Sequence, residues 1–105
     1  MKIIYISIPI TGQEDTYEQR LDEAVEYVGE KYPEYDRIIT HKYVADGLKE
    51  RLEPIIPTYK DYLYEDIGVI KVCDAIFMCN GYYNSRGCLA ELAFADAIGI
   101  TIFFQ

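Results

Sequence analysis

The feature that most constrains this chain is a regular alternation of β-prone runs with helical segments. Residues 2–8 form a nearly unbroken β-prone run, which is typical of a strand buried on both faces. Shorter runs at 37–41, 74–80 and 100–104 predict three more strands. Such alternation predicts a small doubly wound α/β fold of the flavodoxin or Rossmann type, with a parallel sheet of about four strands and helices on both faces.

Helices are expected where apolar residues recur at helical spacing between these strands. The first begins after Asp15, which can cap it together with Glu18 in a capping box, and it ends before Pro33. Residues 42–56 are mixed in character and predict no more than a helical turn or two around 45–52.

The composition is that of a small acidic domain. The 105 residues suffice for one core, so we expect a single domain over residues 1–105, and half of the residues are hydrophobic, which argues against disorder. The formal net charge of −8 argues against a nucleic-acid polymer or an anionic membrane as partner. A small phosphorylated ligand is compatible with this charge, because one turn of backbone N–H groups can bind it.

Targeting signals and metal-binding motifs are not apparent. No segment approaches the roughly 20 apolar residues that span a bilayer, and the start of the chain lacks a signal-peptide cleavage site. Three cysteines without a CxxC motif, together with a single histidine, argue against a zinc site. We therefore expect a cytoplasmic protein with reduced, buried thiols and with neither a metal ion nor an organic cofactor.

Residues that directly follow the strands are the first candidates for a site, because ligands of such sheets bind beyond the carboxyl ends of the strands. The loop after the first strand contains Ile8 and Pro9, and His41 ends the second strand. The loop after the third strand, NGYYNSRG, leads through Ser85 and Gly87 into a helix N-terminus. This turn predicts a binding site for an anion.

Asp66 is an anomalous charge within a predicted helix. That helix is expected over 57–73, with Pro57 as its first residue. Its apolar stripe is formed by Tyr59, Tyr62, Leu63, Ile67 and Ile70. At about 3.6 residues per turn, Asp66 falls in the middle of the stripe. A carboxylate there is costly unless it is paired, hydrogen-bonded or protonated, so Asp66 is either a functional group or lies at a partly solvated helix end.

Glu91 is a second inward charge, in a helix expected over 87–99. Its neighbours one turn away are Gly87, Cys88, Phe94 and Ala95. It lies six residues after Ser85, too far for a capping box, which needs a spacing of three. The alternative is a glutamate at the rim of an exposed helix. Two inward carboxylates on separate helices suit paired acid and nucleophile chemistry, because burial raises the pKa of a carboxyl group.

Four further residues are weaker candidates. A lone strand tyrosine such as Tyr5 is more often a core residue than a site residue, and a single histidine such as His41 is a weak signal by itself. Tyr83 precedes the anion-binding turn and could stack on a base. Arg86 could add positive charge to the anion site or point to solvent.

The chain resembles the nucleoside 2-deoxyribosyltransferase-like superfamily. Within it, the resemblance is to small phage and bacterial proteins that begin with YISGPITG and are related to 2'-deoxynucleoside 5'-monophosphate N-hydrolases. The matching segments are YISIPITG at 5–12, YEDIGVIKVCDAIFM at 64–78 and NGYYNSRGCLAELAFADAIG at 80–99. The resemblance implies one domain of that superfamily and a homo-oligomer, a dimer or higher, with sites near the subunit contacts.

The resemblance also implies roles for individual residues. Glu91 matches the catalytic glutamate that attacks the anomeric carbon, Asp66 the aspartate that helps to protonate the leaving base, and Tyr5 the tyrosine that positions the glutamate. Ser85 stands where the transferases have an aspartate and the monophosphate N-hydrolases have a serine that contacts the phosphate. The implied substrate is a small-molecule nucleoside or, given Ser85, its 5'-monophosphate.

Two departures from the family pattern bear on activity. The glycine of SGPITG is Ile8 here, and a branched side chain is expected to narrow or block the pocket, because glycine lets the backbone approach the sugar closely. The sequence also ends directly after the last predicted strand, where the transferases continue into a segment that completes a neighbouring subunit's site. We therefore expect either a more open pocket or a loss of activity.

The leading hypothesis is cleavage of the N-glycosidic bond of a (2'-deoxy)nucleoside or its 5'-monophosphate through a covalent glycosyl-Glu91 intermediate, with hydrolysis favoured over transfer. The alternative is a catalytically inactive nucleotide-binding module of the same fold. Asp66 and Glu91 together favour the enzyme, whereas Ile8 favours the binding module. A flavodoxin-type electron carrier is disfavoured, because SIPITG lacks the Ser/Thr-rich phosphate loop of that class.

Overall fold

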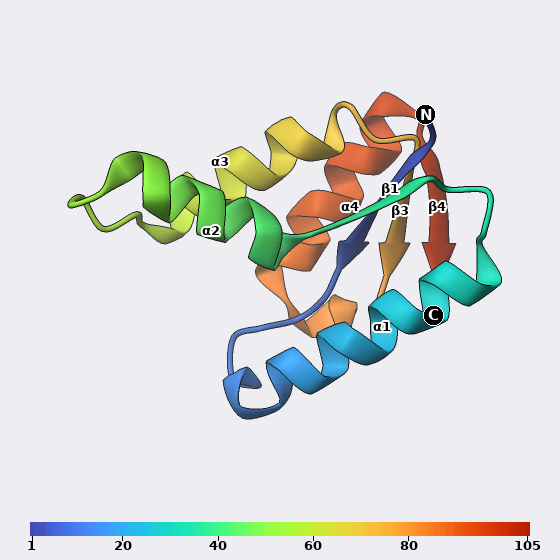
Figure 1. The fold of residues 1–105 in the computed structure, drawn as a ribbon, viewed down its shortest axis with the longest axis horizontal. Helices are drawn as coiled ribbons and strands as arrows, with labels where there is room; N and C mark the ends of the chain where they lie inside the picture. The colour runs from blue at the N-terminus through green and yellow to red at the C-terminus, as the bar shows by residue number, and fades with distance from the viewer.

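A four-stranded parallel sheet forms the centre of the computed structural model, which describes residues 1–105. The strands are β1 (Ile3–Ser7), β2 (Arg37–Thr40), β3 (Ala75–Met78) and β4 (Thr101–Phe104), of which Figure 1 labels β1, β3 and β4. Their order in the sheet is β2-β1-β3-β4, and every neighbouring pair is parallel. The predicted fold class, a doubly wound parallel sheet of about four strands, is confirmed.

Helices cover both faces of the sheet. They are α1 (Tyr17–Lys31), α2 (His41–Leu52), α3 (Tyr59–Ile70) and α4 (Arg86–Ile98). One face packs against α1 through Leu21, Ala24 and Val28. The other face packs against α4 and against the hairpin that α2 and α3 form side by side (Figure 1). None of the helices is both long enough and apolar enough to cross a lipid bilayer.

The side chains of β1 alternate between the two faces. Ile4 and Ile6 belong to the core cluster beneath α1, and Ile8, directly after the strand, continues that row. Tyr5 belongs to the cluster on the opposite face, and Ser7 lies on the same face two residues on. All five are buried, so the first strand is buried on both faces, as its apolar run predicted.

The order in which the chain adds strands to the sheet reverses between the neighbouring strands β1 and β3. The chain passes from β1 to β2 on one side and from β3 to β4 on the other, so the segments that leave β1 and β3 diverge and open a crevice at their carboxyl ends. The register pairs Ser7 with Met78 and so brings the two diverging segments to the same edge of the sheet. The topology therefore places a crevice where the sequence predicted a site.

The predicted capping box of Asp15 and Glu18 is wrong. Asp15 lies in a short 3-10 turn, η1 (Glu14–Thr16), and α1 begins only at Tyr17. Thr16 holds the cap position, but its hydroxyl accepts a hydrogen bond from Nε of Arg20 and does not cap the helix.

The helix predicted over 57–73 is shorter than expected at both ends. α3 begins at Tyr59 and ends at Ile70, and Pro57 lies before the N-cap instead of within the helix. Thr58 is the N-cap because its hydroxyl accepts a hydrogen bond from the backbone N–H of Asp61, while the Asp61 carboxylate accepts one from the backbone N–H of Thr58. This is a complete capping box.

His41 begins α2 instead of ending β2. Thr40 caps the helix through its hydroxyl, and residues 41–52 form a regular helix where the sequence predicted only a turn or two. The buried side of α2 is a narrow row that includes Val44 and Leu48, one turn apart. Because so few apolar residues of this helix face the core, and charged residues surround them, the helical periodicity in the sequence was too weak to predict the whole helix.

Candidate active site

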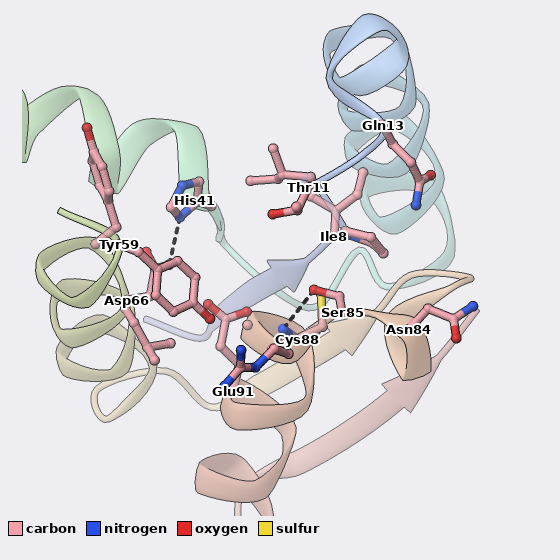
Figure 2. Close-up of a pocket in the computed structure, with 16 residues that line it drawn as sticks. Ile8, Thr11, Gln13, His41, Tyr59, Asp66, Asn84, Ser85, Cys88 and Glu91 are labelled. Atoms are coloured by element: carbon pink, nitrogen blue, oxygen red, sulfur yellow. Dashed lines mark hydrogen bonds and ion pairs between the residues drawn. The ribbon is translucent and has the colours of Figure 1, made fainter.

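A cavity of about 490 Å³ opens at the carboxyl ends of β1 and β3 (Figure 2). This volume lies within the range of small-molecule sites, roughly 300–1,000 Å³. The walls come from the loop after β1, the first residue of α2, one side of α3 and the beginning of α4. The predicted site residues that line the cavity are Ile8, Pro9, His41, Asp66, Ser85, Arg86, Gly87 and Glu91.

Glu91 lies in the second turn of α4 and is only 5 % exposed. Oη of Tyr5 donates a hydrogen bond to its Oε2 at 3.0 Å, and Oγ of Ser7 donates one to its Oε1 at 2.7 Å. Burial, followed by the charge of Glu91, raises the pKa of Tyr5 well above its ordinary value, so the phenol stays a donor. Tyr5 does not line the cavity but holds Glu91 from the buried side. Both oxygens of Glu91 are thus oriented by hydroxyl groups of β1.

Asp66 lies on α3 and is also buried. Its Oδ2 is 2.6 Å from Nδ1 of His41, an interaction that joins α3 to the first residue of α2 (Figure 2). Its other oxygen, Oδ1, is buried and has no hydrogen-bond partner within the chain. A buried polar atom without a partner costs free energy, which a ligand in the cavity could recover.

The two carboxyl groups interact strongly. Burial is the largest cause, and the negative charge of Asp66 the second, of a rise in the pKa of Glu91 to about 8. Hydrogen bonds from Ser7 and Tyr5 lower the pKa and oppose this rise. The pair therefore retains a proton near neutral pH, where two separate carboxyl groups in water would both be ionised. This state suits a site in which one carboxyl group acts as an acid and the other as a nucleophile.

The N-terminus of α4 forms another part of the cavity wall. Ser85 is the N-cap, and its Oγ accepts a hydrogen bond from the backbone N–H of Cys88 at 3.2 Å. Arg86 is the first helical residue, is exposed, and forms no ion pair within the chain. A Cβ atom at Gly87 would lie 3.5 Å from Oη of Tyr59, an ordinary van der Waals distance, so Tyr59 of α3 lies directly beside the first turn of α4. The helix dipole and Arg86 give this wall a positive character.

Ile8 has two environments. It is buried in the core beneath α1, in the same cluster as Leu21 and Ala24, and it also forms part of the cavity wall. The cavity keeps its volume of about 490 Å³ with Ile8 in place. The isoleucine therefore does not block the pocket, although a branched side chain was expected to narrow or block it.

Tyr83 lies outside the cavity, contrary to the prediction. It is 64 % exposed, and it packs edge-on against Tyr82. Both belong to the 3-10 turn η2 (Tyr82–Asn84), in which successive side chains point about 120° apart. Tyr82 packs against the core and Asn84 lines the cavity, so the side chain between them points to solvent.

Sequence reasoning missed several residues of the site. Ser7 is the missed residue that could have been predicted. It lies two residues after Tyr5 in an apolar strand, so the sequence already placed its hydroxyl on the same face as Tyr5. Tyr59 and Tyr62 were assigned to the apolar stripe of a helix but line the cavity, as does Cys88. Aromatic residues on a helix give no local sign of whether they face a core or a pocket.

Comparison with known proteins identifies a family but no activity. The family model described as "Domain of unknown function (DUF4406)" matches residues 2–104, which include every residue of the candidate site. None of the curated proteins matches the chain.

Proposed function

The chain belongs to the family described as "Domain of unknown function (DUF4406)", and we propose that it cleaves the N-glycosidic bond of a (2'-deoxy)nucleoside or of its 5'-monophosphate. The observation that carries the proposal is the buried carboxyl pair. Glu91 is held through both oxygens, and Asp66 beside it has one oxygen without a partner. Glycoside cleavage with a covalent intermediate needs such a pair, one group as nucleophile and the other as acid.

Glu91 is the nucleophile in this proposal. One of its carboxylate oxygens attacks the anomeric carbon C1', the C1'–N bond breaks, and its electron pair goes to the leaving base. Asp66 donates its proton to that base from Oδ1. Both oxygens of Glu91 accept a hydrogen bond from a hydroxyl group, which favours the ionised form of Glu91, so we assign the role of the acid to Asp66.

Water completes the reaction. It attacks C1', the bond from C1' to Glu91 breaks with its electron pair returning to the carboxylate, and the ionised Asp66 accepts the proton of the water. Both carboxyl groups then regain their starting states. Transfer to a second base would use the same steps with a base N–H in place of water. We favour hydrolysis because exposed residues, among them Thr11, Tyr59 and Arg86, line the cavity and leave it accessible to water.

A 5'-phosphate on the substrate would bind at the N-terminus of α4. Backbone N–H groups of a first helical turn favour an anion, and the exposed guanidinium of Arg86 adds a positive charge. Ser85 brings a hydroxyl and no negative charge to this position. These features support a monophosphate among the substrates.

A substrate panel tests the proposal. The protein is incubated with 2'-deoxynucleosides, ribonucleosides and their 5'-monophosphates, and released base is measured by chromatography. We expect Glu91→Ala to lower the rate by about three orders of magnitude or more, whereas Glu26→Gln, on the exposed side of α1, keeps the rate of the wild type. If the wild type released no base from any substrate, the proposal would be refuted. Binding without turnover would then support the alternative, a catalytically inactive nucleotide-binding module.

A further inference from the structure

The only histidine in the chain, His41, contacts the cavity and Asp66 at the same time. We propose that His41 is a positioning residue: its Nδ1–H donates to Oδ2 of Asp66 and so confines the acid proton of Asp66 to Oδ1, the oxygen available to a leaving base. The inference deepens the proposed function and rests on it, but the hydrogen bond of His41 can be tested without any activity.

The contact between His41 and Asp66 is short and sheltered. Nδ1 lies 2.6 Å from Oδ2, and the side chains are 22 % and 5 % exposed, respectively. Thr40 caps α2 and so determines that His41 is its first residue. The ring of Tyr62 packs edge-on against the imidazole, with 5.9 Å between the ring centroids. The imidazole is thus held in place and directs one nitrogen at one carboxyl oxygen.

The two oxygens of Asp66 therefore differ. Oδ2 is occupied by His41, whereas Oδ1 is buried and has no partner. A proton on Oδ1 can be donated to a base in the cavity. A proton on Oδ2 would instead be held by the imidazole and would be lost to the reaction. Asp66 can therefore act as the acid only when its proton is on Oδ1.

The tautomer of His41 decides between these two states. A neutral imidazole has one N–H group and one acceptor nitrogen, and the partner of one nitrogen sets the state of the other. If Nδ1 carries the proton, it donates to Oδ2 and leaves Oδ1 for the acid proton. If Nδ1 is the acceptor, it draws the proton of Asp66 onto Oδ2.

Nitrogen NMR of the histidine-labelled protein tests the tautomer directly, because a single histidine gives signals that need no assignment. Near neutral pH we expect a protonated Nδ1, and we expect its slowly exchanging N–H signal to vanish in Asp66→Ala. An unprotonated Nδ1 in the wild type would overturn the inference, whether or not the protein releases base.

The effect of His41 on catalysis is tested by measuring how the loss of activity in a His41 variant depends on the acidity of the leaving base. We choose nucleosides of one sugar whose bases differ in acidity, such as uracil, 5-fluorouracil and 5-nitrouracil. His41→Ala is expected to lower kcat/KM by about tenfold or more for the least acidic base and by clearly less for the most acidic one, which needs less protonation. His41→Asn, whose amide can donate to Oδ2, should recover much of the loss.

The possible outcomes separate this inference from the proposed function. A loss of the same size for every base would show that His41 only supports the fold, and would overturn the inference while leaving the proposed function intact. If the wild type released no base at all, the proposed function would fail, and the NMR result would decide the role of the His41 contact by itself.

Discussion

The phenol oxygen of Tyr5 lies 3.0 Å from Oε2 of Glu91, although the two residues are 86 positions apart in the chain. Tyr5 is fully buried in β1, and Glu91 lies on α4. Ser7, on the same face of β1, adds a second hydrogen bond at 2.7 Å. The carboxyl group that we propose as the nucleophile is therefore positioned from β1, a central strand of the sheet that is buried on both faces.

Removal of the Tyr5 hydroxyl should shift the pH dependence of activity. Tyr5→Phe keeps the buried ring but removes a donor that favours ionised Glu91, so the pKa of Glu91 should rise further. The acidic limb of kcat/KM against pH should move to higher pH. At neutral pH we expect a loss of about tenfold or more, since a hydrogen bond to a charged group contributes roughly 1.5–3 kcal/mol. Tyr64→Phe, an exposed control on α3, should change nothing, and an unchanged profile for Tyr5→Phe would contradict its role.

The buried carboxyl group of Glu91 should make stability depend on pH. Its pKa is raised from 4.5 to about 8, so the folded state binds the proton more tightly than the unfolded state. The resulting stabilisation is complete below about pH 4.5 and is lost as the pH rises through about 8. The loss should amount to a few kcal/mol, given about 1.4 kcal/mol per pKa unit.

Urea unfolding of the wild type and of Glu91→Gln, at about pH 5, 7 and 9, measures this effect. The glutamine cannot ionise, so the variant should gain in free energy of unfolding relative to the wild type as the pH rises. A constant difference between the two proteins across this range would contradict the raised pKa.

Ser85 can be tested without loss of its helix cap. Ser85→Asp and Ser85→Asn both supply a good N-cap side chain, so α4 should stay intact in either variant. The aspartate alone adds a negative charge beside the proposed phosphate position. We expect it to raise the KM of a 5'-monophosphate by about tenfold, which corresponds to roughly 1.4 kcal/mol, with little change for the unphosphorylated nucleoside. Equal effects of Ser85→Asp on the two substrates would remove the phosphate role.

Ile8 should contribute more to the free energy of unfolding than Ile10, which lies in the same loop. Its side chain is buried against α1, so Ile8→Ala should lower the free energy of unfolding by roughly 2–5 kcal/mol. Ile10 also lines the cavity but lies outside this core cluster, so Ile10→Ala should cost clearly less. Urea denaturation measures both variants, and equal costs would show that the contact of Ile8 with α1 is unimportant.

Local periodicity predicted much of the candidate site. Apolar runs located the strands, and the ends of those strands pointed to the edge at which the cavity lies. Helical phase placed Asp66 and Glu91 on inward faces, and both are buried. These predictions succeed because a period of two or of about 3.6 residues determines which side chains share a face, whatever that face packs against. Ser7 could have been found by the same rule from its spacing to Tyr5.

The sequence by itself thus determined on which face of its own strand or helix each side chain lies. The tertiary structure alone decided which of these side chains meet: His41 with Asp66, Asp66 with Glu91, and Glu91 with the hydroxyl groups of β1. It also decided that Tyr83 points to solvent. The distance between two elements depends on how the whole core packs them together, and no spacing within either element encodes that distance.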